Sequence, residues 1–200
     1  MHIKDIGILL FEEFETLDVF GPVEIFGRLK DYYRISFYSQ TGGLVKNSQG
    51  VSIDTHKLEN MAGSLDIFLI PGGMGTRKEV DNSSLINVIK QAANSSTYVL
   101  TVCTGSALLA KTGLLDNRAA TSNKMAFDWA ISNGKRVKWI KKARWTVDGK
   151  YYTSSGISAG MDMTLGFIKD RHGLDMARKV AFQIEYNWQE NMDTDNFCNQ

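Results

Sequence analysis

Residues 98–106 read YVLTVCTGS, so an apolar run is followed at once by a cysteine and a turn. The run at 98–102 predicts a buried strand, and residues 107–110 (ALLA) continue as a helix. A strand, a sharp turn and a helix in direct succession would hold Cys103 at the mouth of a sheet, facing backbone N–H groups and the positive end of the helix dipole. Because these groups favour the thiolate, we expect the pKa of Cys103 to lie below the ordinary value of about 8.5. The alternative, a small buried hydrophobe, is the usual role of a lone cysteine and stays open.

Strand and helix patterns alternate on both sides of this stretch, which predicts an α/β fold with a parallel sheet covered by helices on both faces. We expect strands at 6–11, 34–39, 65–70, 98–102 and 119–122, a peripheral hairpin or extension at 44–54, and a hairpin of 143–147 with 151–154. Helices are expected at 17–29, 84–93, 124–132, 160–171 and 175–186, with Trp129 packed in the core. The chain contains no linker or repeat, so we expect one domain over residues 1–200, with a core of about 6–186 and an exposed tail of 187–200.

Composition narrows the class of protein. Hydrophobic residues make up 43% and charged residues 22% of the 200 positions, as is ordinary for a soluble globular chain. A formal net charge of +1 argues against nucleic acid and membrane surfaces as partners, and the basic run at 135–144 is more typical of a solvated strand and turn. Two cysteines make no disulfide framework, and no signal peptide or membrane span is evident. We therefore expect a cytoplasmic protein.

The carboxyl ends of parallel strands form the ligand crevice of such a sheet, so three loops should meet beside Cys103. The first contains Asp18, at the start of the helix expected at 17–29. A carboxylate there is favoured by the helix dipole alone, which is the more ordinary interpretation. The functional alternative is that Asp18 shares a proton with Cys103 or with a substrate.

The second loop is the turn at residues 71–75 (PGGMG). Gly72 and Gly73 fit a tight turn with a positive φ, and they lack the Lys-Ser/Thr of a phosphate loop. An unobstructed N–H near Gly73, together with the N–H of Thr104, could also stabilise negative charge that develops on a substrate.

Histidines and metal-ligand patterns are poorly placed for catalysis. None of His2, His56 and His172 follows an expected core strand, so we do not expect a Cys-His-Asp triad. The sequence has no HExxH, paired cysteines or carboxylate–histidine cluster, and we expect neither a metal nor another cofactor.

Five segments together carry a resemblance to a known family. Residues 17–24 (LDVFGPVE), 70–75 (IPGGMG), 102–106 (VCTGS), 112–115 (TGLL) and 156–162 (GISAGMD) resemble, in this order, the ThiJ/PfpI superfamily of class I glutamine-amidotransferase-like proteins. The resemblance extends over about residues 6–186. It is closest to the isonitrile hydratase-like branch and the sensor domains of AraC-type regulators.

The resemblance implies a flavodoxin-like three-layer sandwich, a homodimer, and Cys103 on a strained nucleophile elbow. In isonitrile hydratases the thiolate attacks the isocyanide carbon, and water converts the resulting thioimidate into an N-substituted formamide. Carried over to this chain, Cys103 is the nucleophile, Asp18 the acid/base bonded to it, and Thr104 a positioning residue. The implied oxyanion and substrate-binding residues are Gly72, Gly73, Gly156 and Ile157.

One departure from the pattern concerns Asn123, which stands where many relatives carry a pocket histidine. This weakens a protease, amidase or glyoxalase assignment, and the absence of a helix-turn-helix after Tyr186 disfavours a DNA-binding regulator. Two classes stay open: a cysteine-dependent hydratase or lyase acting on a small molecule, and a non-enzymatic sensor in which Cys103 is oxidised. An accessible pocket over Cys103 would favour the enzyme.

Overall fold

An eight-stranded sheet forms the centre of the protein in the computed structural model, which describes residues 3–60 and 65–198. The strand order is β3-β4-β2-β1-β5-β6-β10-β9. Neighbours from β4 to β10 are parallel, and β3 and β9 are antiparallel strands at the two edges. In this order the strands are Gly43–Lys46, Ser52–Lys57, Tyr33–Ser39, Lys4–Leu9, Ile67–Ile70, Tyr98–Thr101, Tyr151–Ser154 and Trp145–Asp148.

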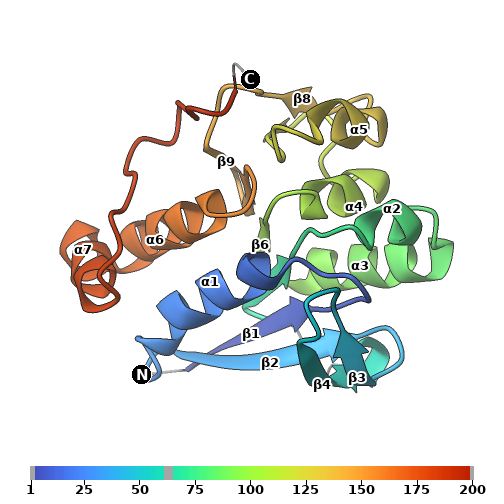
Figure 1. Cartoon of the computed structure of the whole chain (residues 1–200), viewed down its shortest axis with the longest axis horizontal. Coiled ribbons are helices and arrows are strands. Elements are labelled where there is room, and N and C mark those ends of the chain that lie inside the picture. Colours follow the sequence, from blue (N-terminus) through green and yellow to red (C-terminus); the bar gives the residue numbers. More distant parts are fainter. Residues whose placement is uncertain (1–2, 61–64, 199–200) are drawn as a thin grey trace.

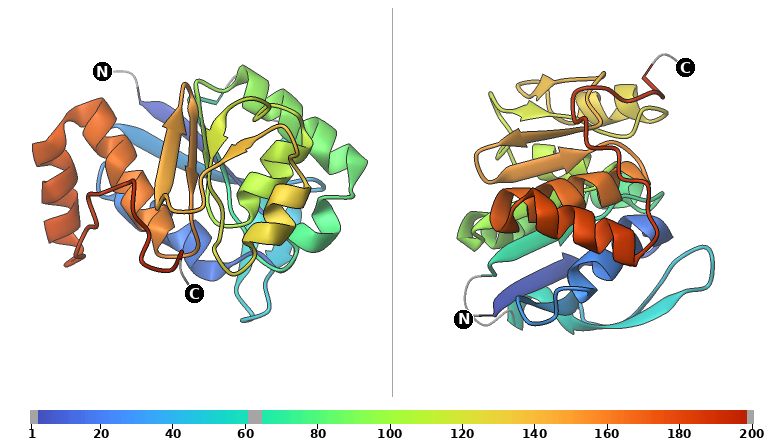
Figure 2. Two further views of the ribbon diagram at one scale, coloured as in Figure 1. Left: turned by 90° about the horizontal axis from the view of Figure 1, so that it is seen from above. Right: turned by 90° about the vertical axis from the view of Figure 1, so that its left-hand side faces the viewer.

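Helices cover both faces of the sheet (Figures 1 and 2). On one face α1 (Thr16–Gly27) packs on α6 (Ala159–His172), which packs on α7 (Leu174–Gln183). On the other face α4 (Gly105–Lys111) packs against α2 (Thr76–Glu79), α3 (Ser83–Ser95) and α5 (Phe127–Ser132). The three-layer α/β architecture expected from the alternating pattern is confirmed.

The central strands are covered on both faces, and their sequence reflects it. All four residues of β5, Ile67 to Ile70, are buried, as are all four residues of β10. Strands that are covered on both faces read as continuous apolar runs, which is why β5 was recognisable from sequence. Helix α3 buries one apolar stripe instead, and the side chain of Asn82 caps it by accepting a hydrogen bond from the Leu85 N–H at 3.1 Å.

Some elements differ from the expectation. The hairpin expected at 44–54 is present as the antiparallel pair β3 and β4, but it is not separate from the main sheet, because β4 pairs in parallel with β2. The strand expected at 119–122 is only β7 (Ala119–Ala120), which pairs with β8 (Lys138–Trp139) in a separate two-stranded sheet. The helix expected from residue 124 begins at Phe127, because Asn123 Oδ1 accepts the Ala126 N–H at 3.0 Å and holds a turn before it. The short helix α2 and a 3₁₀ turn, Leu58–Asn60, were not expected.

The C-terminal segment 187–198 docks on the rest of the chain instead of being exposed throughout (Figure 1, red). Asp195 is buried, and its N–H donates to the Lys142 carbonyl at 2.7 Å. The Met192 carbonyl accepts the Arg144 N–H at 2.8 Å, so this segment is tied to the body along its length. Among the helices in the described ranges, none has the length and apolar character needed to cross a bilayer.

Candidate functional site

Cys103 lies two residues after the end of β6, at the carboxyl edge of the sheet, and β6 lies between β5 and β10. Its φ of 56° is in the left-handed region, which costs a non-glycine residue about 1–2 kcal/mol. Three hydrogen bonds hold this strained turn: the Cys103 N–H donates to the Ser155 carbonyl at 3.2 Å, and its carbonyl accepts the hydroxyls of Ser106 and Ser122, each at 3.0 Å. The expected nucleophile elbow is present.

Gly105 allows α4 to start immediately behind the elbow. A Cβ at this position would lie 2.3 Å from the Ile70 carbonyl oxygen and 2.7 Å from that of Pro71. Helix α4 can therefore begin against the end of β5 only because residue 105 has no side chain.

Asp18 reaches the same place from α1. Its carboxyl group is fully buried, and Oδ2 accepts the Gly72 N–H at 2.8 Å. The other oxygen, Oδ1, is buried without a hydrogen-bond partner among the described residues. Gly72 has no space for a side chain, since a Cβ would lie 2.7 Å from the Thr104 nitrogen and 2.8 Å from Asp18 Oδ2. The structure therefore brings together Asp18, Gly72, Cys103 and Thr104, which the sequence had assigned to one site.

Burial sets the protonation of the Cys103–Asp18 pair. It raises the pKa of the Cys103 thiol well above its ordinary value, and the neighbouring Asp18 charge raises it further. The Thr104 N–H lowers this pKa by bonding to the sulfur, but it does not outweigh burial, so our expectation of a lowered pKa was wrong in direction. Burial likewise raises the pKa of Asp18, against the lowering effect of its bond from the Gly72 N–H. The pair therefore retains a proton at neutral pH.

Gly73 has the positive φ expected of the turn, but its N–H is not free to face a substrate as expected. Its φ of 131° favours glycine, and its N–H donates to Thr104 Oγ1 at 3.2 Å. The amide that we expected to face a substrate therefore has an internal partner. Thr76 completes this network, because its hydroxyl donates to the Gly73 carbonyl at 2.7 Å and lies 3.0 Å from Thr104 Oγ1. Gly73 and Thr76 thus fix the side chain of Thr104 beside the sulfur.

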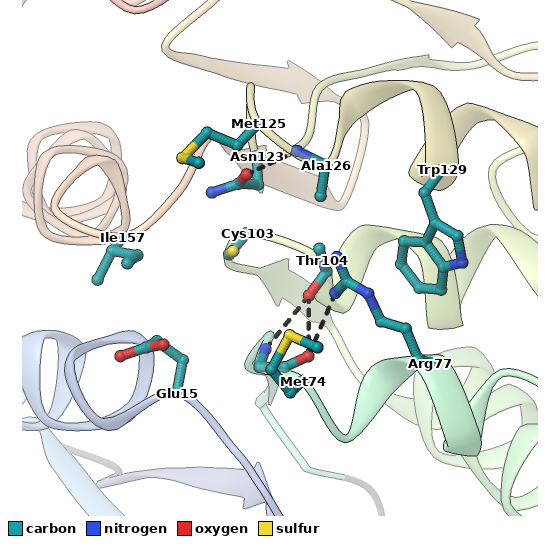
Figure 3. A pocket seen from close by; sticks show the side chains of 11 residues that line it. Glu15, Met74, Arg77, Cys103, Thr104, Asn123, Met125, Ala126, Trp129 and Ile157 are labelled. Atoms are coloured by element: carbon teal, nitrogen blue, oxygen red, sulfur yellow. Dashed lines mark hydrogen bonds between the residues drawn. The ribbon is translucent and has the colours of Figure 1, made fainter. Parts of the chain in front are cut away.

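A cavity of about 520 Å³ opens over the thiol (Figure 3). Cys103 is only 6% exposed, yet it contributes to the wall of this cavity. The volume is within the usual range for small-molecule sites. The lining residues are Glu15, Gly73, Met74, Arg77, Cys103, Thr104, Asn123, Met125, Ala126, Trp129 and Ile157.

A second cavity of about 430 Å³ adjoins the first, and the two share Asn123, Met125 and Ile157. It is also lined by Leu17, Lys124, Ser155, Gly156, Ser158 and Phe197. Gly156 makes room for the amide of Asn123, since a Cβ on residue 156 would lie 1.9 Å from Asn123 Nδ2. Of the two predicted substrate-binding residues, Ile157 therefore lines both cavities and Gly156 lines the second.

Several lining residues were not identified from the sequence. Trp129, which we expected in the core, is partly buried and carries the Arg77 guanidinium 4.1 Å above its ring. Glu15 and Met74 lie in two of the predicted loops and Arg77 lies two residues after the turn at 71–75, and these positions were the only available signal. Their side-chain positions depend on α1, α2 and α5 meeting at one edge of the sheet.

The histidines of the described residues lie elsewhere. Neither His56 nor His172 lines the two cavities, and His172 Nε2 is 2.7 Å from the Tyr33 hydroxyl. His2 lies outside the described residues. Within residues 3–60 and 65–198, no group of three or more His, Cys, Asp or Glu side chains is arranged to hold a metal ion.

Known proteins resemble this chain in sequence over most of its length. The sequence profile of the DJ-1/PfpI family matches residues 4–170. The isonitrile hydratase of Pseudomonas putida is 30% identical over 181 residues, covering 90% of this chain and 78% of that protein. The HTH-type transcriptional regulator CdhR of Pseudomonas aeruginosa is 27% identical over 185 residues, and the chain spans 54% of its length.

Solved structures show the same fold. A ThiJ/PfpI family protein from Pseudomonas syringae superposes with a TM-score of 0.81 at 23% identity, covering 94% of this chain and 76% of that one. Drosophila melanogaster DJ-1beta superposes with a TM-score of 0.80 at 18% identity, covering 94% of this chain and all (100%) of the other. The flavodoxin-like sandwich is therefore shared with these proteins.

Proposed function

The chain belongs to the DJ-1/PfpI family, and from that premise we propose that it is a cysteine-dependent hydratase or lyase that converts isocyanides into N-substituted formamides. The observation that carries the proposal is the strained Cys103 elbow, which faces a cavity of about 520 Å³ and has Asp18 buried beside it. The isonitrile hydratase relative supports the substrate class.

The first step joins the thiol to the substrate. Asp18 accepts the thiol proton while the Cys103 sulfur bonds to the terminal carbon of the isocyanide. The same proton then passes to that carbon, which gives a thioimidate, R–N=CH–S–Cys103. The Asp18 carboxyl group is suited to this transfer, because it is buried near the thiol and its Oδ1 has no hydrogen-bond partner among the described residues.

The second step releases the product. Water adds to the thioimidate carbon, its proton is delivered to nitrogen, and the carbon–sulfur bond breaks to return the thiol. The net reaction is R–NC + H₂O → R–NH–CHO, with no change in the sulfur between start and end. Thr104 assists by donating its N–H to the sulfur as negative charge develops there.

A redox sensor is the second candidate, and DJ-1beta is among the proteins of the same fold. Oxidation proceeds through the thiolate, so the raised pKa of Cys103 disfavours it at neutral pH. The accessible cavity also favours an enzyme, because a sensor needs no space for an organic group. Assembly as a homodimer and a cytoplasmic location stay predictions from the sequence, and light scattering tests the first.

The test is formamide production from a panel of simple isocyanides. We expect product from the wild type and from Cys198→Ser, the matched control for loss of a thiol that lines neither cavity. Cys103→Ala should give no product, and Asp18→Asn should lose about 10²–10⁴-fold in rate. No product from the wild type across the panel would overturn the proposal. Full activity in Asp18→Asn would remove Asp18 from the mechanism but leave the nucleophile in place.

A further inference from the structure

Arg77 is a cation of the Cys103 cavity that has no acidic partner among the described residues. Its Nη1 donates to Thr76 Oγ1 at 3.0 Å and to the Gly73 carbonyl at 3.4 Å, and it forms no ion pair. Six other arginines do pair with a carboxylate: Arg28, Arg34, Arg118, Arg136, Arg144 and Arg178. The remaining nitrogens of the Arg77 guanidinium are therefore available to a ligand.

The guanidinium is also held in place before any ligand arrives. It stacks on Trp129 at 4.1 Å, and the bond to Thr76 fixes its rotation from the other side. A side chain that is already immobilised loses little conformational entropy on binding. A partly buried cation without a counterion is costly, and a bound anion would remove that cost.

The charges around the cavity indicate which anion fits. Glu15 also lines the cavity, and Figure 3 shows it on a different side of Cys103 from Arg77. Asp18 is buried behind the thiol. A cavity lined by one guanidinium and one carboxylate, with a second carboxyl group buried next to the thiol, suits a single negative charge better than a phosphate dianion. Its planar fork also matches a carboxylate through two parallel hydrogen bonds.

We propose that the Arg77–Trp129 end of the cavity binds a carboxylate group of the substrate while the reactive carbon lies at Cys103. The anion site follows from the cavity itself. That the reactive group is an isocyanide rests on the proposed function, and the substrate would then be an isocyanide that carries a carboxylate.

Alkylation of Cys103 tests the anion site without reference to hydration. Iodoacetate and iodoacetamide have nearly the same shape and both alkylate the thiolate with loss of iodide, but only iodoacetate carries a carboxylate. The readout is the ratio of their rates at Cys103, measured by peptide mass spectrometry. Both reagents react with the same thiolate, so a change in its pKa or nucleophilicity alters both rates equally and leaves the ratio unchanged.

We expect Arg77→Met to lower the iodoacetate-to-iodoacetamide ratio about tenfold and Arg77→Lys to lower it less. The matched control is Lys78→Met, which removes the same charge from the neighbouring exposed residue outside the cavity. An unchanged ratio in Arg77→Met, or an equal change in Lys78→Met, would overturn the inference.

Hydration kinetics then separate the two proposals. With isocyanoacetate and its methyl ester as substrates, Arg77→Met should raise KM for the acid about tenfold more than it raises KM for the ester. If the wild type hydrates neither these two compounds nor any member of the isocyanide panel, but the alkylation ratio responds to Arg77, the proposed function fails and the anion site stands. If both compounds are hydrated and neither readout depends on Arg77, the anion site fails and the proposed function stands.

Discussion

Cys103 and Asp18 share one buried environment, in which the Asp18 charge raises the pKa of the thiol, whereas the interaction with the thiol lowers the pKa of Asp18. Burial raises the pKa of both groups, so neither gives up a proton readily to water. A proton that moves within the pair avoids placing two negative charges side by side. The two groups therefore titrate as a unit, and the thiol becomes nucleophilic by passing its proton to a neighbour or to a substrate.

Replacing Asp18 by Asn should separate thiol reactivity from catalysis. The substitution removes a negative charge beside Cys103, so the pKa of the thiol falls and the alkylation profile with iodoacetamide moves to lower pH. Hydration should fall in the same variant because the proton acceptor is lost. Glu24→Gln, which alters an exposed acid of α1 outside both cavities, should change neither readout. Slower alkylation of Asp18→Asn than of the wild type at neutral pH would contradict the inference that the Asp18 charge raises the pKa of the thiol.

The sequence located these groups but not their electrostatics. Asp18, Gly72, Cys103 and Thr104 follow or flank strong strand and turn patterns, so their meeting at one sheet edge was predictable. The direction of the thiol pKa shift was not, because it depends on how completely distant segments exclude water from the sulfur.

At the scale of elements, the turn between β10 and α6 shapes the junction of the two cavities. Gly156 has no side chain, and the amide of Asn123 occupies the space beside it. Asn123 Oδ1 in turn accepts the Ala126 N–H ahead of α5. The absence of a side chain at Gly156 therefore determines the position of the loop that contains Asn123.

Gly156→Ala should destabilise the protein by about 1–2 kcal/mol, because the new methyl group displaces Asn123 and breaks its bond to Ala126. The matched control is Gly27→Ala at the end of α1, where a Cβ meets nothing within 4 Å. That change should be neutral or stabilising by up to about 1 kcal/mol. Urea unfolding with a common m-value measures both, and equal stabilities would contradict the proposed packing.

Element patterns predicted the central strands and long helices to within a few residues. They missed α2 and the β7–β8 pairing, since α2 has only four residues and β7 and β8 only two each, too few for a hydrophobic pattern to repeat. Arg77 lies on α2. The sequence pattern did not predict this helix, so it gave no indication that Arg77, the residue proposed to select the substrate, would line the cavity.

At the scale of the whole molecule, a buried charge cluster fastens the C-terminal segment. Arg144 Nη2 lies 2.6 Å from Asp162 Oδ2, and its Nη1 lies 3.7 Å from Asp195 Oδ1. Lys124 lies 4.0 Å from Asp195, and burial lowers its pKa to about 8. The basic run that we interpreted as a solvated face thus ends in a buried arginine, and contacts so distant in sequence leave no local pattern.

Arg144→Met should lower the free energy of unfolding by about 3–5 kcal/mol, because it leaves the buried carboxylates of Asp162 and Asp195 without their main counterion. Residues 187–198 should also become sensitive to limited proteolysis. The matched control is Arg28→Met, which removes an exposed ion pair with Glu24 on α1. This substitution should lower the free energy of unfolding by only about 0–1 kcal/mol. If both variants unfold at the same urea concentration, the cluster does not secure this segment.

The strand order also has a consequence for biosynthesis. The amide of the nucleophile is bonded to Ser155, which follows the last strand of the sheet in the order of translation. A nascent chain that has emerged from the ribosome only as far as α5 contains Cys103, Asp18 and Gly72 but not this partner. The strained turn at Cys103 therefore lacks one of its three hydrogen bonds until translation has passed β10, and its geometry is completed only when the last strand of the sheet is in place.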